Sequence, residues 1–248
     1  MLYRLQVKKI GDENMNPRQS ARIVGVLFII ATAAPILTAP FLGFLGGAII
    51  GEPVPDYLVT LSENENQVIT GMYIELIWAL AVVGIPIVLF PILKKYNEVL
   101  ARLFYSFRFI EALSTIEHSL ILLTLLSLSH EFIVAGAPDV SYFQALGTLL
   151  LEVREWVFNI GSGLIWSLSA LVLNYILYRS KLVPWWLSVW GLIGSILSFV
   201  TYFLGFFSIY LSNWFFAPIA VQEMAFAVWL IAKGFDSTVI ASFSERIN

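Results

Sequence analysis

Ionisable residues stand inside stretches of this sequence that are otherwise apolar enough to cross a bilayer. The clearest case is Arg102–His130, which carries Arg108, Glu111, Glu117 and His118 among aliphatic and aromatic residues. At about 100° per residue, Arg108, Glu111 and His118 share one side of such a helix, and Glu117 points to the other side. Ionised side chains are costly in hydrocarbon and need partners in a helix bundle or a wet cavity. We therefore expect these residues to mark whatever site the chain contains.

Other apolar stretches repeat this pattern of isolated polar groups. Their polar residues are Glu75, Glu152, Arg154, Glu155, Asn159 and Glu223. At about 100° per residue, Glu152, Glu155 and Asn159 share one helix face. Counting about 1.5 Å per residue from the helix ends places acids of several helices at similar depth, in the outer half of the membrane. We expect a polar pocket open toward the outer face, lined by Glu75, Glu117, His118, Glu152, Glu155 and Glu223.

The charges in these stretches do not balance. Two arginines, Arg108 and Arg154, stand among six carboxylates. The three-residue spacing of Arg108 and Glu111 predicts an ion pair within one helix. Arg154 lies nearly opposite Glu152, which predicts a carboxylate partner on a neighbouring helix. Even with His118 charged, at least three acids are left to be protonated, hydrated or bound to a cation. The alternative is that all these charged residues only neutralise one another and hold the helices together.

A metal site is a sharper hypothesis drawn from the same residues. Imidazole and carboxylate groups suit a divalent ion, and the candidate ligands are His118, Glu75, Glu152 and Glu155. Against a metal, no HExxH or ExxH spacing occurs. The chain has no cysteine, which excludes thiolate sites and a cysteine nucleophile, and no GxSxG, P-loop or GxGxxG motif. The GSG run at Gly161–Gly163 indicates close helix packing rather than catalysis.

The composition is that of a membrane protein. Of 248 residues, 59% are hydrophobic and 12% are charged, against about 25% charged in soluble domains. We predict an all-α polytopic bundle, because each apolar stretch can span about 30 Å of hydrocarbon. The six predicted spans are Ala21–Ile50 (kinked at Pro35 and Pro40), Val68–Leu93, Arg102–His130, Phe143–Leu177, Pro184–Leu211 and Phe215–Lys233. A net charge of -3 gives no reason to expect a nucleic acid partner.

Basic residues gather on one side of the predicted bundle. The three loops on the opposite side contain no lysine or arginine. The positive-inside rule therefore places both termini in the cytoplasm and the chain in the cytoplasmic membrane. A soluble helical protein would not explain this asymmetry.

The expected domain organisation has three parts. Residues 1–20 form a polar cytoplasmic segment, 21–234 the six-helix transmembrane domain, and 235–248 a cytoplasmic tail. Met15 opens a second plausible start, so whether residues 1–14 belong to the native protein is left open.

Turn residues and caps predict the connections between spans. We expect loops at Gly51–Asn66 and Ser129–Tyr142 and a short break at Ser212–Trp214. Asn97 is a candidate N-cap for the third helix. Gly234 is expected to end the sixth helix.

Three stretches resemble a known family. They are YRSKLVPWWLSVWGLIGSIL (Tyr178–Leu197), QEMAFAVWLIAKGF (Gln222–Phe235) and ARIVGVLFIIATAAP (Ala21–Pro35). Together they resemble the bacterial and archaeal membrane proteins grouped as domain of unknown function 4386, over nearly all of the chain after Met15. The resemblance implies a polytopic membrane protein and supplies no activity and no site residues.

Three functions from different classes fit these observations. The first is binding or transport of a small molecule, cation or proton through the carboxylate-rich pocket. The second is a membrane-embedded enzyme that uses Glu and His, with or without a metal cofactor, on a lipid-like substrate. The third is a scaffold or partner subunit in which the polar set is internal glue. The partners we expect are the lipid bilayer and such a ligand, with a homo-oligomer as a further option.

Overall fold

The computed structural model describes residues 16–45, 56–138 and 142–245. Within these ranges every regular element is helical. Six of the described helices are long and apolar enough to cross a membrane. The predicted all-α bundle of six spans is therefore confirmed.

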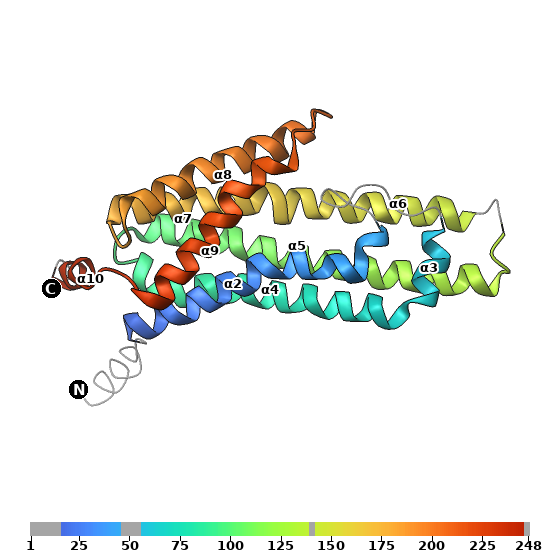
Figure 1. Ribbon diagram of the computed structural model, residues 1–248, viewed down its shortest axis with the longest axis horizontal. Helices are drawn as coiled ribbons and strands as arrows, with labels where there is room; N and C mark the ends of the chain where they lie inside the picture. The colour runs from blue at the N-terminus through green and yellow to red at the C-terminus, as the bar shows by residue number, and fades with distance from the viewer. Residues whose placement is uncertain (1–15, 46–55, 139–141, 246–248) are drawn as a thin grey trace, which may run out of the picture.

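The spans follow one another along the chain with short connections. They are α2 (Pro17–Leu42), α4 (Glu65–Leu93), α5 (Glu98–Val134), the continuous run of α6 (Tyr142–Val157), η2 (Phe158–Ile165) and α7 (Trp166–Ser180), then α8 (Trp185–Gly205), and η3 (Asn213–Phe216) with α9 (Ala217–Ala232). The shorter elements are η1 (Gly43–Leu45), α3 (Tyr57–Glu63) and α10 (Ser237–Glu245). Figure 1 shows an elongated bundle in which α10 and the start of α2 lie at the same end, as an even number of spans requires.

Local signals set several helix ends. The Asn97 side chain accepts a hydrogen bond of 3.0 Å from the Leu100 amide, so the predicted N-cap of α5 is confirmed. Pro17 opens α2, where its missing N–H loses no helical bond. Gly234, which follows the C-cap Lys233 of α9, has φ +78°, a conformation that glycine adopts without strain, so the predicted stop is also confirmed.

Several predicted boundaries were wrong. The expected loop Gly51–Asn66 contains α3, because Tyr57, Leu58 and Leu61 recur at helical spacing and are buried. The apolar run of α5 continues to Val134, well into the second expected loop.

The last two spans also differ in extent from the prediction. Span five ends at Gly205, six residues before the expected Leu211. The expected break at Ser212–Trp214 overlaps the 3-10 turn η3. The part of the first span beyond residue 45 lies outside the described residues.

The fourth span is interrupted by a π-helix that the sequence analysis did not predict. The π-helix η2 covers eight residues and includes the GSG run. A Cβ on Gly161 would lie 2.1 Å from the Ser114 Cβ, and one on Gly163 would lie 2.5 Å from the Tyr202 ring. Only glycine permits these approaches to α5 and α8, which confirms the packing role expected for the run.

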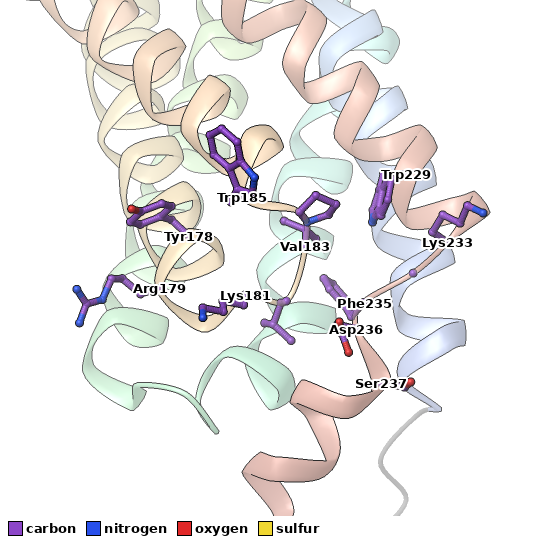
Figure 2. Close-up of a pocket in the computed structure, with 13 residues that line it drawn as sticks. Tyr178, Arg179, Lys181, Val183, Trp185, Trp229, Lys233, Phe235, Asp236 and Ser237 are labelled. Atoms are coloured by element: carbon purple, nitrogen blue, oxygen red, sulfur yellow. The ribbon is translucent and has the colours of Figure 1, made fainter.

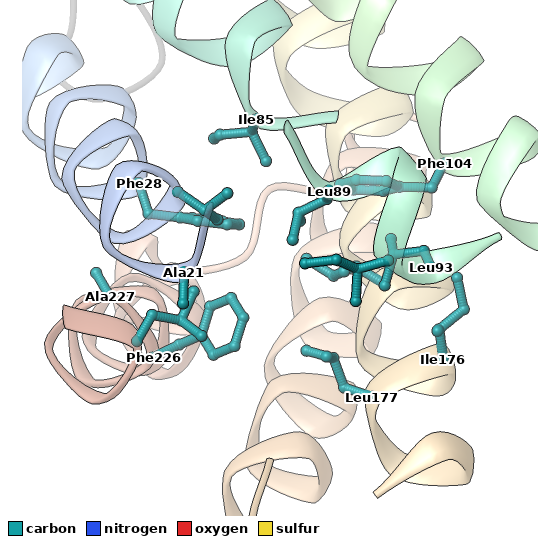
Figure 3. Close-up of a cluster of buried hydrophobic side chains, with 14 of the residues drawn as sticks. Ala21, Phe28, Ile85, Leu89, Leu93, Phe104, Ile176, Leu177, Phe226 and Ala227 are labelled. Atoms are coloured by element: carbon teal, nitrogen blue, oxygen red, sulfur yellow. The ribbon is translucent and has the colours of Figure 1, made fainter. Parts of the chain in front are cut away.

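Two hydrophobic clusters fill the interior, one toward each end. The first lies near the termini and joins α2, α4, α5, α7 and α9, with Phe28, Leu89 and Phe104 at its centre (Figure 3). The second gathers α3, the start of α4 and the distal half of α5, and includes Leu61 and Leu122. Large apolar side chains also cover the outside of the bundle, as expected where lipid is the solvent.

The spans differ greatly in length. Helix α5 has 37 residues and the α6–η2–α7 run has 39, whereas α8 has 21. In Figure 1 the distal ends of α5 and α6, together with α3, extend beyond the turn between α8 and α9.

Candidate functional site

Charged side chains are buried at two levels inside the bundle. Among the described residues, the buried charged side chains are Glu75, Arg108, Glu111, Arg154 and Glu223. Three of these carry a carboxylate and two a guanidinium group. They form two groups along α5, which we name the Arg154 cluster (Glu75, His118 and Arg154) and the Arg108 cluster (Arg108, Glu111 and Glu223).

The Arg154 cluster joins α4, α5 and the fourth span by direct contacts. Arg154 Nη2 donates to Glu75 Oε1 at 2.5 Å, and its Nη1 donates to the His118 backbone carbonyl at 2.6 Å. Ser119 Oγ donates to the second oxygen, Glu75 Oε2, at 2.8 Å. The carboxylate Glu75 is thus the partner on a neighbouring helix that the position of Arg154, opposite Glu152, predicts.

His118 completes this cluster from the side. Its Nδ1 lies 3.1 Å from Glu75 Oε1, but the ring is not aligned with that oxygen for a hydrogen bond. The ring also packs against Phe158 of η2, with centroids 5.8 Å apart. One carboxylate and one guanidinium therefore form the ion pair of this cluster, and the imidazole packs beside them.

The Arg108 cluster joins α5 to α9 and α2. Arg108 Nη1 lies 3.2 and 3.1 Å from the two oxygens of Glu111, the intrahelical pair predicted from the three-residue spacing. Arg108 Nη2 lies 3.8 Å from Glu223 Oε1, beyond hydrogen-bond distance. The other oxygen, Glu223 Oε2, accepts a hydrogen bond of 2.8 Å from the Thr32 hydroxyl. The Trp166 indole also lies within hydrogen-bonding reach of Glu223.

Arg108 is held in an apolar cage and retains hydrogen-bonding capacity. Its guanidinium carbon lies 5.5 Å from the Phe28 ring centroid and 5.8 Å from that of Phe104. Such cation–π contacts are attractive, and more strongly so where water is excluded. Its buried Nε makes no hydrogen bond to any residue that the structure describes. The guanidinium is therefore not saturated by the protein groups around it.

Hydroxyl groups on one face of α5 connect the two clusters. Thr115 Oγ1 donates to the Glu111 carbonyl at 3.0 Å and lies 3.3 Å from Ser162 Oγ of η2. Ser119 Oγ lies 3.2 Å from the Thr115 carbonyl as well as donating to Glu75. Glu111 and Ser119 are eight residues apart, about 12 Å along the helix. Polar atoms thus line this face of α5 between the clusters, and the Thr115 hydroxyl is bonded to the Glu111 backbone carbonyl rather than to its carboxylate.

The remaining predicted site residues lie outside both clusters. Glu117 and Glu152 are exposed, because each points away from the arginine on its own helix. Glu155 is half-buried and accepts a 3.1 Å hydrogen bond from Asn159 Nδ2, one turn away. Of the four proposed metal ligands the structure brings His118 and Glu75 together, and in the described part of the chain no group of three or more His, Asp or Glu could hold a metal ion.

The comparison with known families agrees with this architecture. Residues 23–234 match the family model described as a domain of unknown function, DUF4386. The chain belongs to the DUF4386 family. It is an integral, multi-pass membrane protein, as the family match and the six apolar helices together support. No curated protein and no solved structure matches the chain.

Sequence reasoning missed several polar residues of this DUF4386 protein. Thr32, Ser119, Thr115 and Ser162 all contact the clusters or connect them. The spacing of residues 111, 115 and 119 at four-residue intervals was a readable signal, since it places their side chains on one helix face. Thr32 had no such signal, because its role depends on how α2 packs against α9.

Proposed function

We propose that this protein binds and exchanges a proton at the Arg108 cluster, as part of a proton-coupled carrier for a small solute. The observation that carries this proposal is the convergence of two buried carboxylates, from α5 and α9, on one guanidinium. One positive charge neutralises one carboxylate. A second ionised carboxylate would leave a net negative charge in an apolar interior, which is costly unless a proton or a cation compensates it.

The geometry favours Glu223 as the group that holds the proton. Glu111 contacts Arg108 through both oxygens, whereas Glu223 approaches it only to 3.8 Å. The Thr32 hydroxyl beside Glu223 can rotate to donate to a carboxylate or to accept from a carboxylic acid. Glu223 can therefore change protonation state without losing its neighbour on α2.

The polar line along α5 supports exchange with the outer level. The Thr115 and Ser119 hydroxyls lie between Glu111 and Glu75. Series of buried Asp, Glu and His residues are typical of proton relays in pumps and transporters, and Glu111, Glu75 and His118 provide such groups along this path.

Infrared spectroscopy of the protein in lipid tests the proposal directly. At neutral pH the wild type should show the C=O band of a protonated carboxyl group, and Glu223→Gln should remove or shift it. Glu117→Gln is the matched control, because Glu117 lies on α5 but is exposed, and it should leave the band unchanged. Absence of the band in wild type would overturn the proposal; if added Na⁺ or K⁺ then stabilised the protein, a bound cation would take the place of the proton.

A scaffold role is the second candidate, and one observation favours it. In the Arg154 cluster both carboxylate oxygens of Glu75 accept hydrogen bonds from protein groups, as expected of a residue that only holds helices together. If both Glu223→Gln and Glu111→Gln behaved as wild type in the infrared experiment, while a defined partner co-purified with each, the scaffold function would be preferred.

A further inference from the structure

A cavity lies at the end of the bundle that carries the termini. It has a volume of about 1000 Å³ and opens between the α7–α8 connection and the α9–α10 connection. Figure 2 shows Trp185 and Trp229 on either side of it, Val183 between them, Lys181 below Trp185, and Arg179 and Lys233 at opposite edges. The cavity is separate from both buried clusters, since it shares no residue with them.

The charge of this cavity is positive. Arg179, Lys181 and Lys233 line it, and in the described residues neither lysine makes an ion pair. The acidic lining residue Asp236 is already engaged: its Oδ1 accepts bonds of 2.6 and 2.9 Å from the hydroxyl and amide of Thr238. The Asp236 carboxylate therefore binds the first turn of α10, and the cationic side chains of Arg179, Lys181 and Lys233 can attract an anion.

The first turn of α8 adds to this potential. Pro184 is its N-cap and provides no side-chain hydrogen bond to the helix amides. Pro184 and Trp185 both line the cavity, so the positive end of the α8 dipole is part of its wall. Helix N-termini of this kind favour phosphate groups.

The two connections that form the cavity are fixed to each other. The Asp236 amide donates to the Leu182 carbonyl at 3.0 Å, which ties the α9–α10 connection to the α7–α8 connection. Lys181 has φ +60° at the C-cap of α7, and Leu182 and Val183 next to it are buried. The lining is therefore a built surface rather than a set of independent side chains.

The level of the cavity indicates the kind of anion. It lies where α7 and α9 end, with Trp185, which is 70% exposed, on one side and Trp229 on the other. Tryptophans at helix ends of this kind occupy the headgroup level of a bilayer. We propose that this cavity binds the phosphate of an anionic phospholipid headgroup, with the lysines on the phosphate and the tryptophans against the glycerol and upper acyl chains.

Lipid titration of the full chain in detergent micelles tests the proposal. Thermal stability and retained lipid, the latter by native mass spectrometry, are measured with added phosphatidylglycerol, phosphatidylcholine or inorganic phosphate. Phosphatidylglycerol should bind and stabilise most, and the Lys181→Gln/Lys233→Gln pair should weaken its binding about 10- to 30-fold. The control is Lys94→Gln/Lys95→Gln, which removes the same charge at the same end of the bundle, outside the cavity.

The outcomes separate the lipid from other sources. Equal loss in the control pair, or equal binding of the two lipids, would overturn the proposal. Equal stabilisation by inorganic phosphate would assign the cavity to a free phosphate instead and would also overturn it. The pair Lys181→Arg/Lys233→Arg keeps both charges and must retain phosphatidylglycerol, so a folding defect of the glutamine pair cannot be mistaken for lost binding.

Discussion

Removing the carboxylates of the Arg108 cluster one at a time and then together should give strongly non-additive losses of stability. In Glu223→Gln, Arg108 keeps its two contacts with Glu111. In Glu111→Gln, Glu223 is 3.8 Å away and can close on the guanidinium as an ionised partner. Each single variant therefore leaves one positive and one negative charge in the cluster.

The expected losses of stability follow from the number of charges that each variant leaves in the Arg108 cluster. A single variant exchanges one hydrogen-bonding group for another of the same size, and we expect it to lower the free energy of unfolding by about 1 kcal/mol or less. The double variant leaves a buried guanidinium with no carboxylate, a situation that typically costs about 3–5 kcal/mol. We expect the lower end, near 3 kcal/mol, because helices unfolded within a bilayer or micelle still find polar partners.

The assay is reversible unfolding in mixed micelles, followed by far-UV circular dichroism as the fraction of denaturing detergent rises. A double-mutant cycle then yields the coupling free energy, expected at about 1–3 kcal/mol with the double variant worse than the sum. Two single variants that each cost 3 kcal/mol or more would refute the reasoning, since both carboxylates would then be ionised and required. An additive, small loss in the double variant would refute it equally.

Three further outcomes are expected from other parts of the fold. Glu75→Gln leaves Arg154 without its 2.5 Å carboxylate partner and should cost about 3 kcal/mol in the same unfolding assay, with the Arg154→Gln double variant less than additive. Gly191→Ala should lower the free energy of unfolding by at least about 2 kcal/mol or prevent folding, because the new Cβ would lie 2.0 Å from the side-chain oxygen of Asn174. Gly205→Ala is the control: it places a Cβ in open space and should lower the free energy of unfolding by about 1 kcal/mol or less. Hydrogen bonds to the Asp236 carboxylate lower its pKa. The ionised carboxylate therefore stabilises α10 at pH values above the ordinary aspartate pKa of about 4, and this stabilisation disappears as the pH falls through the lower pKa of the folded protein. Amide hydrogen exchange of α10, corrected for intrinsic rates, should show this pH dependence in wild type and not in Asp236→Asn.

The sequence was sufficient for the spans and for contacts within one helix. Apolar length alone predicts a membrane helix, and the three-residue spacing of Arg108 and Glu111 alone predicts their pairing. The outward direction of Glu117 relative to Arg108 also followed from helical geometry. These features depend only on positions along one chain segment.

Contacts between helices could not be predicted in the same way. That Glu223 faces Arg108, and that Glu75 faces Arg154, depends on which helices are neighbours and at what rotation. A single sequence does not encode that arrangement in any spacing. The π-helix had a weak signal in the GSG run, but the extra residue per turn rotates α6 relative to α7, and a count at 100° per residue across the run is then in error.

The spanning helices differ in length, so parts of the protein extend to different distances along the bundle axis. Sixteen residues separate the lengths of α5 and α8, about 24 Å of helix, which is most of a hydrocarbon layer. Beside α8 the aromatic residues Phe207, Tyr210 and Trp214 are highly exposed and suit the lipid headgroups, so the bilayer surface should meet the protein there. With the bilayer surface at that level, the last turns of α5 extend beyond it, and the exposed Glu131 near the end of α5 is accessible to reagents that never enter the membrane.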